Sequence, residues 1–192
     1  MGSPARAGPA CVLCPFRRQR DGHSAAPGGR APPLHAQRRD GTMAAMEKTR
    51  GYAHRLDLRT DLTPVWAALT DSELLAQWCS PDATISARPG GLFRARVDRL
   101  TELEACIDVW VPEQRLRLIY LPSAALPPTE SALVDDFILE PARSGTILRL
   151  LGSGIPADPQ WDLPYLRLRT GWQAALVRLK ALLESTDAVE GL

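Results

Sequence analysis

Two ionisable residues, His54 and Asp135, stand in strand-like segments where alternation turns them toward a protein interior. Successive side chains of a strand point to opposite faces, so His54 shares a face with Leu56 and Leu58. Asp135 shares one with Phe137. A histidine or carboxylate in an apolar enclosure can act as a general acid or base, or anchor the polar end of a ligand. These two residues are our candidates for catalysis, singly or as a hydrogen-bonded pair.

Each candidate has a purely structural alternative. A histidine on an inward face can simply be hydrogen-bonded or lie at the rim, and Asp135 could sit at a strand end and reach solvent. If Asp135 is buried, it needs a partner, a raised pKa or a wet cavity, because an unpaired buried charge is costly. The sequence does not give the strand order, so it leaves open whether His54 and Asp135 approach each other.

Other reactive groups are sparse in this sequence. It offers no evident nucleophile, metal-ligand cluster or phosphate-binding loop. Cys11 and Cys14 have metal-like spacing, but the intervals to His23 and His35 do not fit a two-Cys two-His zinc site. We therefore expect no metal and no other cofactor. The two remaining cysteines are expected to be reduced, apolar residues.

Composition divides the chain into a tail and a domain. Residues 1–48 are rich in Gly, Pro, Ala and Arg and lack apolar periodicity, so they are predicted to be disordered and could lie upstream of the true start. Residues 50–186 carry the periodic apolar pattern of one domain, and 187–192 are predicted to be a flexible C-terminus.

Charge and hydropathy narrow the function classes. The net charge is +1, and the basic residues of the tail leave the domain mildly acidic without a basic stripe. This pattern disfavours nucleic-acid binding. The chain contains neither an apolar run long enough to span a membrane nor a secretory signal, so we expect a cytoplasmic protein.

The periodicity predicts an antiparallel sheet covered by one long helix. An alternating strand over 52–60 precedes two short helices over 63–78, with Thr63 and Asp71 as caps. About six further strands follow, and the spacing of apolar residues over 163–185 predicts an amphipathic helix. In one of these strands the predicted inward set is Leu103, Ala105, Ile107, Val109 and Val111. The fold class is therefore α+β.

Several strings in this order resemble the START-like, helix-grip superfamily, often called SRPBCC, in its branch of activators of heat-shock-protein-90 ATPase homologues. The matching strings are VWAALTDSELLAQW at 65–78, GGLFR at 90–94, Val111-Pro112 followed by RLRLIY at 115–120, GTILRLLGSGIP at 145–156 and GWQAALVRLKALLE at 171–184. The chain departs from the family pattern at Cys79, where a second tryptophan is common, and at Ala105, where glycine is common. Asp135 also stands where the family usually has an apolar residue.

The resemblance implies an apolar cavity between a curved sheet and the C-terminal helix. On this basis Trp66 would pack in the core and Trp78 near one mouth of the cavity. The residues expected to line a ligand are Trp78, Phe93, Val97, Tyr120, Phe137, Trp172 and Leu176. The alternative is that all of these side chains are ordinary core.

Three functions are compatible with this interpretation. The first is binding of an apolar or amphipathic small molecule in the cavity. The second is a cyclase-like or hydratase-like enzyme of the polyketide cyclase kind, in which His54 or Asp135 transfers a proton. The third is a co-chaperone acting on a protein partner, as the family name implies, although its founding members also depend on a separate N-terminal domain that residues 1–48 are too short to form.

Overall fold

The computed structural model describes residues 48–96 and 101–186. The predictions for the tail up to residue 47, for Val97 and for residues 187–192 lie outside the described residues. The same holds for the cysteine and histidine positions considered for a zinc site.

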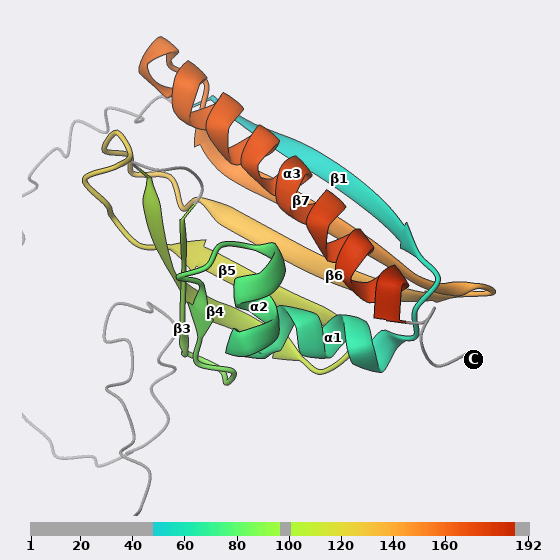
Figure 1. The fold of residues 1–192 in the computed structure, drawn as a ribbon. Helices are drawn as coiled ribbons and strands as arrows, with labels where there is room; N and C mark the ends of the chain where they lie inside the picture. The colour runs from blue at the N-terminus through green and yellow to red at the C-terminus, as the bar shows by residue number, and fades with distance from the viewer. Residues whose placement is uncertain (1–47, 97–100, 187–192) are drawn as a thin grey trace, which may run out of the picture. The chain divides into compact units, whose positions relative to one another are not determined.

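The described chain forms a seven-stranded antiparallel sheet with three α-helices and one short 3-10 helix (Figure 1). In chain order the elements are β1 (Thr49–Leu58), α1 (Leu62–Thr70), α2 (Ser72–Trp78), β2 (Thr84–Ile85), β3 (Leu92–Arg96), β4 (Glu102–Val111), β5 (Arg115–Tyr120), β6 (Val134–Ala142), β7 (Gly145–Pro156), η1 (Pro159–Trp161) and α3 (Asp162–Thr186). This order confirms the predicted α+β, helix-grip architecture.

The sheet order is β1-β7-β6-β5-β4-β3-β2, so the first strand pairs with the last one. Every other neighbouring pair is consecutive along the chain. The long helix α3 crosses one face of this sheet, over β1, β7 and β6, while α1 and α2 lie beside it (Figure 1). One face of the sheet is thereby buried against helices, as the alternating strand pattern requires.

The apolar stripe of α3 packs on the sheet as its spacing predicts. Its six buried apolar positions are Leu168, Trp172, Ala175, Leu176, Leu179 and Leu183. Each is at most 9% exposed. Since α3 is the one long helix among the described elements, most of the core depends on this stripe.

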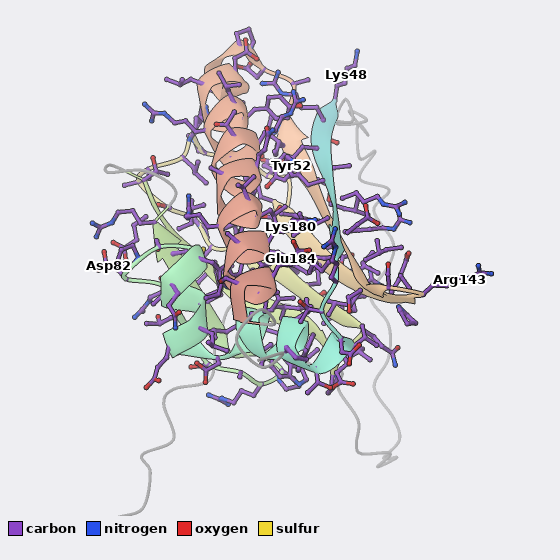
Figure 2. The ribbon with its side chains drawn as sticks, turned by 45° about the vertical axis from the view of Figure 1, so that its right-hand side comes forward. Lys48, Tyr52, Asp82, Arg143, Lys180 and Glu184 are labelled. Atoms are coloured by element: carbon purple, nitrogen blue, oxygen red, sulfur yellow. The ribbon has the colours of Figure 1, made fainter. Side chains whose placement is uncertain are left out.

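Polar groups of α3 also reach the outer edge of β1. The ammonium of Lys180 donates to the carbonyl of Asp57 at 2.6 Å, and the Tyr165 hydroxyl donates to that of Gly51 at 3.3 Å. Figure 2 shows Lys180 and Glu184 toward the end of α3 that lies near β1. These contacts cover an edge strand that would otherwise present unpaired backbone groups to other chains.

The caps of the two short helices differ from each other. The Asp71 side chain caps α2 by accepting from the amides of Glu73 and Leu74, as predicted. The cap predicted at Thr63 is wrong, because α1 already begins at Leu62. The Thr63 hydroxyl instead donates to Glu113 at 2.6 Å.

A bulge in β4 overturns part of the predicted inward set. The register between β4 and β5 shifts between Ile107 and Val109, so the later residues change face. Trp110 consequently packs against the edge of Trp66, with ring centroids 5.0 Å apart, while Val111 is 38% exposed. The bulge thus places Trp110 in contact with Trp66 of α1.

Candidate functional site

The carboxylate of Asp135 lies fully buried on β6 and accepts three hydrogen bonds from side chains of three other elements. The Tyr52 hydroxyl of β1 donates to Oδ1 at 2.6 Å. The Tyr120 hydroxyl of β5 and the Trp172 indole of α3 both donate to Oδ2, the latter at 2.7 Å. The prediction that Asp135 points inward is confirmed, and its exposed fraction is 0%.

A glycine in β7, the strand between β1 and β6, allows the Tyr52 hydroxyl to reach Asp135. Gly152 of β7 pairs with Tyr52 on one side and with Asp135 on the other. The Tyr52 ring therefore lies across Gly152 to reach the carboxylate. A Cβ atom built at Gly152 would stand 2.2 Å from the ring carbon Cζ of Tyr52. Only the missing side chain leaves room for the aromatic ring. Figure 2 shows Tyr52 on the α3 side of β1.

Burial and hydrogen bonding act on this carboxylate in opposite directions. Burial raises the pKa of Asp135 to about 6, while the hydrogen bonds from Tyr120, Tyr52 and Trp172 favour the charged form and limit the rise. Burial and the charge of Asp135 raise the pKa of both tyrosines well above the usual value. At neutral pH the group is a carboxylate held by protonated donors.

The second predicted candidate, His54, lies outside this network. Its ring is tilted against that of Tyr52, with centroids 5.6 Å apart, and it makes no hydrogen bond to Asp135. Its Nε2 atom is buried without a partner among the described residues. Burial lowers the pKa of His54, which keeps the ring neutral at pH 7. The hydrogen-bonded pair of His54 and Asp135 considered from the sequence does not form, because Tyr52 takes that place.

Four aromatic side chains of the predicted cavity lining pack together beneath α3. Trp172 packs against Trp78, Phe93 and Phe137, with ring centroids between 5.3 and 6.4 Å apart. Leu176, also expected to line a ligand, is 4% exposed. The void left between Trp172, Phe93 and their neighbours has a volume of about 20 Å³. This holds one water molecule at most.

Trp78 is a core residue, which corrects its expected place at a cavity mouth. Its side chain is 1% exposed, and its indole donates to the carbonyl of Ala68 at 2.8 Å. Trp66 instead retains partial exposure. Trp78 is therefore the more deeply buried of the two tryptophans, held by its hydrogen bond from α2 to α1.

A larger hollow, here called the loop pocket, opens at the connection between β5 and β6. Its volume is about 460 Å³. It is lined by Tyr120, Leu133, Trp161 and residues of the connecting loop, which are Leu121, Pro122, Ser123, Ala124, Leu126, Pro127, Pro128, Thr129 and Ser131. Tyr120 therefore belongs both to this pocket and to the Asp135 network. Of the predicted ligand-lining residues that the structure describes, it is the one that borders the loop pocket.

Sequence reasoning missed three residues that build this region. Tyr52 lies two residues before His54 and so shares its predicted inward face, but no role was assigned to it. Gly152 interrupts an apolar strand, which is a recognised sign of close approach by another group. Trp161 follows the sheet in a short Pro-containing turn, and its pattern carried no signal.

Metal and membrane sites are not found in the described chain. Over residues 48–96 and 101–186 the histidine, cysteine and acidic side chains form no cluster that could hold a metal ion. None of the helices in these same ranges is long and apolar enough to span a bilayer.

The comparisons with known proteins agree with this fold. Residues 59–184 match the family described as Activator of Hsp90 ATPase homolog 1-like protein. A search among curated proteins found no match.

Solved structures with low sequence identity to this chain have a similar fold. Protein MLL2253 from Mesorhizobium loti is 23% identical with a TM-score of 0.62, covering 71% of this chain and 98% of its own. The Aha1 dimer from Colwellia psychrerythraea is 19% identical with a TM-score of 0.61, covering 70% and 96%. CalU16 from Micromonospora echinospora is 20% identical with a TM-score of 0.51, covering 70% and 73%.

These likenesses establish the fold, and the match over 59–184 extends across most of the described domain, from the end of β1 to the end of α3. The chain belongs to the Activator of Hsp90 ATPase homolog 1-like protein family.

Proposed function

We propose that this protein binds a small, uncharged and largely apolar molecule in the loop pocket. The observation that carries the proposal is the pocket itself, which has a volume of about 460 Å³ and a lining without charged side chains among the described residues. Pockets that enclose small ligands are usually of this size and mostly apolar. The hollow between Trp172 and Phe93, by contrast, has a volume of about 20 Å³.

The composition of the pocket supports a stable opening. Apolar area in the lining comes from three leucines, at 121, 126 and 133, and from the tryptophan at 161. The prolines at 122, 127 and 128 restrict the backbone of the loop and cannot extend into the space as longer side chains would. The wall is thus apolar, with little side-chain volume to fill the hollow.

Asp135 is a positioning residue in this proposal. It is fully buried and its oxygens already accept three hydrogen bonds, so a pocket ligand meets Tyr120 rather than the carboxylate. Acid–base catalysis needs a group within hydrogen-bond reach of the substrate. The geometry therefore favours binding over the cyclase-like alternative. The other predicted ligand-lining residues belong to the buried core and do not line the loop pocket; they are Trp78, Phe93, Phe137, Trp172 and Leu176.

Native mass spectrometry of the freshly purified protein tests the proposal. An excess mass that disappears on denaturation would reveal a bound molecule, and solvent extraction would identify its class. Ala124→Phe places a ring in the loop pocket and should abolish the excess mass. Val177→Phe is the control, because Val177 is 64% exposed on α3 and does not line this pocket. An excess mass that persists in Ala124→Phe would place the ligand elsewhere.

A protein partner is the second candidate function, favoured by the family description as an ATPase activator. Its direct test is the ATPase rate of an Hsp90-type chaperone with and without this protein. An unchanged rate over a wide concentration range would remove this candidate.

A further inference from the structure

Helix α3 carries a second apolar stripe, here called the outer stripe, on the side that faces away from the sheet. Leu163, Leu166 and Val177 are 55%, 50% and 64% exposed. Single exposed apolar residues are common, but a row of them marks an interaction site. Steps of three and four residues place the whole set on one side of the helix, over a length of about 27 Å. The exposed members of the outer stripe are Leu163, Leu166, Thr170, Ala174, Val177 and Ala181.

Basic side chains border the outer stripe on both sides. By the periodicity of the helix they form two rows, which are Arg167 with Arg178 and Arg169 with Lys180. Residues 163–183 contain these four basic residues and no acidic one, whereas residues 49–161 contain 11 basic and 15 acidic ones. The outward side of α3 is therefore positively charged in a domain that is otherwise acidic.

Contacts within the domain leave most of this charge in place. Arg178 donates to two backbone carbonyls at the end of α2, at 2.8 and 2.9 Å, and keeps its charge. Lys180 pairs with Glu184 at 3.4 Å, which offsets its charge. Asp162, the acidic residue of the first turn, is itself paired with Arg50 at 2.6 Å. The positive charge is consequently strongest in the first half of α3, where the two exposed leucines lie.

Shape and charge together indicate what covers the outer stripe. Figure 2 shows α3 in front of the sheet with no other described element over it, so the stripe forms a ridge. Neither the loop pocket nor the hollow at Trp172 is lined by its exposed leucines or Val177. A second copy of the chain would bring the basic rows of two helices together, and like charges repel. An anionic bilayer offers the opposite charge and accepts separate apolar side chains among its headgroups.

We propose that α3 docks this protein on the surface of an anionic lipid bilayer. The outer stripe inserts at the level of the headgroups, and the basic rows reach the lipid phosphates while their apolar stems lie along the interface. The helix lies along the membrane and does not cross it. This surface is separate from the loop pocket, so the proposal holds whether or not that pocket binds a ligand.

Co-sedimentation of the whole chain with vesicles tests the proposal. Phosphatidylcholine vesicles that contain phosphatidylglycerol should bind the protein, vesicles of phosphatidylcholine alone should bind it much more weakly, and added salt should reduce the difference. Replacing both exposed leucines, in Leu163→Ser with Leu166→Ser, should lower the partition coefficient about tenfold or more. Arg169→Glu should lower it about tenfold, because it reverses a charge at the interface.

Matched controls place the same changes elsewhere on the surface. Val111→Ser removes an apolar side chain that is 38% exposed on β4. Arg143→Glu reverses an exposed charge in the turn between β6 and β7, which Figure 2 shows away from α3. Both should change the partition coefficient by less than about twofold. The basic tail is present in every variant, so it cannot cause a difference between the α3 variants and the controls.

Three results would overturn the proposal. The first is equal binding of the unmodified protein to vesicles with and without phosphatidylglycerol, or no binding to either. The second is an equal effect of the α3 variants and the controls, which would assign the binding to another surface. The third is a dimer, detected by sedimentation velocity without vesicle binding, that the double serine variant dissociates, because the outer stripe would then pack against a second copy. Circular dichroism and the melting temperature establish that each variant is folded.

Discussion

The two hollows of this domain differ in what fills them, although each is lined by a residue that donates to the same buried carboxylate. Beside α3, the hollow between Trp172 and Phe93 has a volume of about 20 Å³. At the β5–β6 connection, a loop of prolines and small residues leaves about 460 Å³. Trp172 belongs to the first region and Tyr120 to the second, and each donates to Oδ2 of Asp135.

This difference shows how a helix-grip fold can close one cavity and keep another. A long helix with an apolar stripe packs tightly when large rings fill the space between it and the sheet. The loop between β5 and β6 has no such stripe. Its prolines restrict the backbone and add little side-chain volume, so the loop pocket stays open. Asp135 connects the two regions, and changes around it should separate packing from binding.

The largest expected effect is the loss of the carboxylate. Asp135→Leu leaves the donors of Tyr52, Tyr120 and Trp172 without an acceptor in a dry environment. We expect the free energy of unfolding, measured by urea denaturation at neutral pH, to fall by about 4 kcal/mol.

The neighbouring residue provides the control for this change. Asp136 points to the opposite face and pairs with Arg115, whose side chain is 41% exposed. Asp136→Leu should cost less, about 2 kcal/mol, because the Arg115 guanidinium that it leaves unpaired is partly exposed and can be solvated. Equal losses in the two variants would contradict the special role of the inward carboxylate.

The pH dependence of stability should report the same group. The folded pKa of Asp135 is about 6, against 3.8 for an ordinary aspartate, so between these values the folded state holds more protons than the unfolded state. Its contribution therefore falls as the pH rises from about 4 to about 6, by about 3 kcal/mol in total. Asp135→Asn should lack this component, and the difference between the two urea-denaturation profiles isolates it. Parallel profiles would refute the assignment.

Gly152→Ala tests the path by which Tyr52 crosses β7. The new methyl group collides with the ring, so the tyrosine must shift and lose its bond to Asp135. We expect a loss of about 2 kcal/mol, the usual worth of a hydrogen bond to a charged group. In a Tyr52→Ala background the ring is absent and the same glycine change should cost much less. Additive losses would mean that the ring and the glycine are independent.

The smallest effects compare the two hollows directly. Ala175→Phe adds a ring to the filled space beneath α3 and should lower the melting temperature, with a loss of about 1 to 3 kcal/mol from overpacking. Ala124→Phe adds the same ring to the loop pocket, where there is room, and should change stability by about 0.5 kcal/mol or less. If both variants lose equally, the pocket is not a free space.

Much of the fold could be predicted because it depends on the spacing of apolar and capping residues within single helices and strands. The stripe of α3, the cap at Asp71 and the inward phase of Asp135 all follow from spacing within one element. Val111 was predicted on the wrong face, since a bulge depends on the register of two strands and leaves no mark in the alternation of one.

The site was less predictable because it depends on strand order. His54 and Asp135 share an inward face, but β7 separates their strands and the register sets Tyr52, not His54, opposite Gly152. The sequence contains both Gly152 and Tyr52, but no local pattern indicates that these two residues are in contact. The cavity expected beneath α3 likewise depended on how completely four aromatic rings fill it.

The pairing of β1 with β7 has a further consequence for how this domain is made. Thr49 lies opposite Pro156, so the sheet joins segments that are synthesised far apart in time. The covering contacts from Tyr165 and Lys180 come later still. While the chain is growing, β1 has neither its neighbour nor its cover, and its early exposure invites association with other nascent chains. With so high a contact order, the domain should fold slowly and only once α3 has left the ribosome.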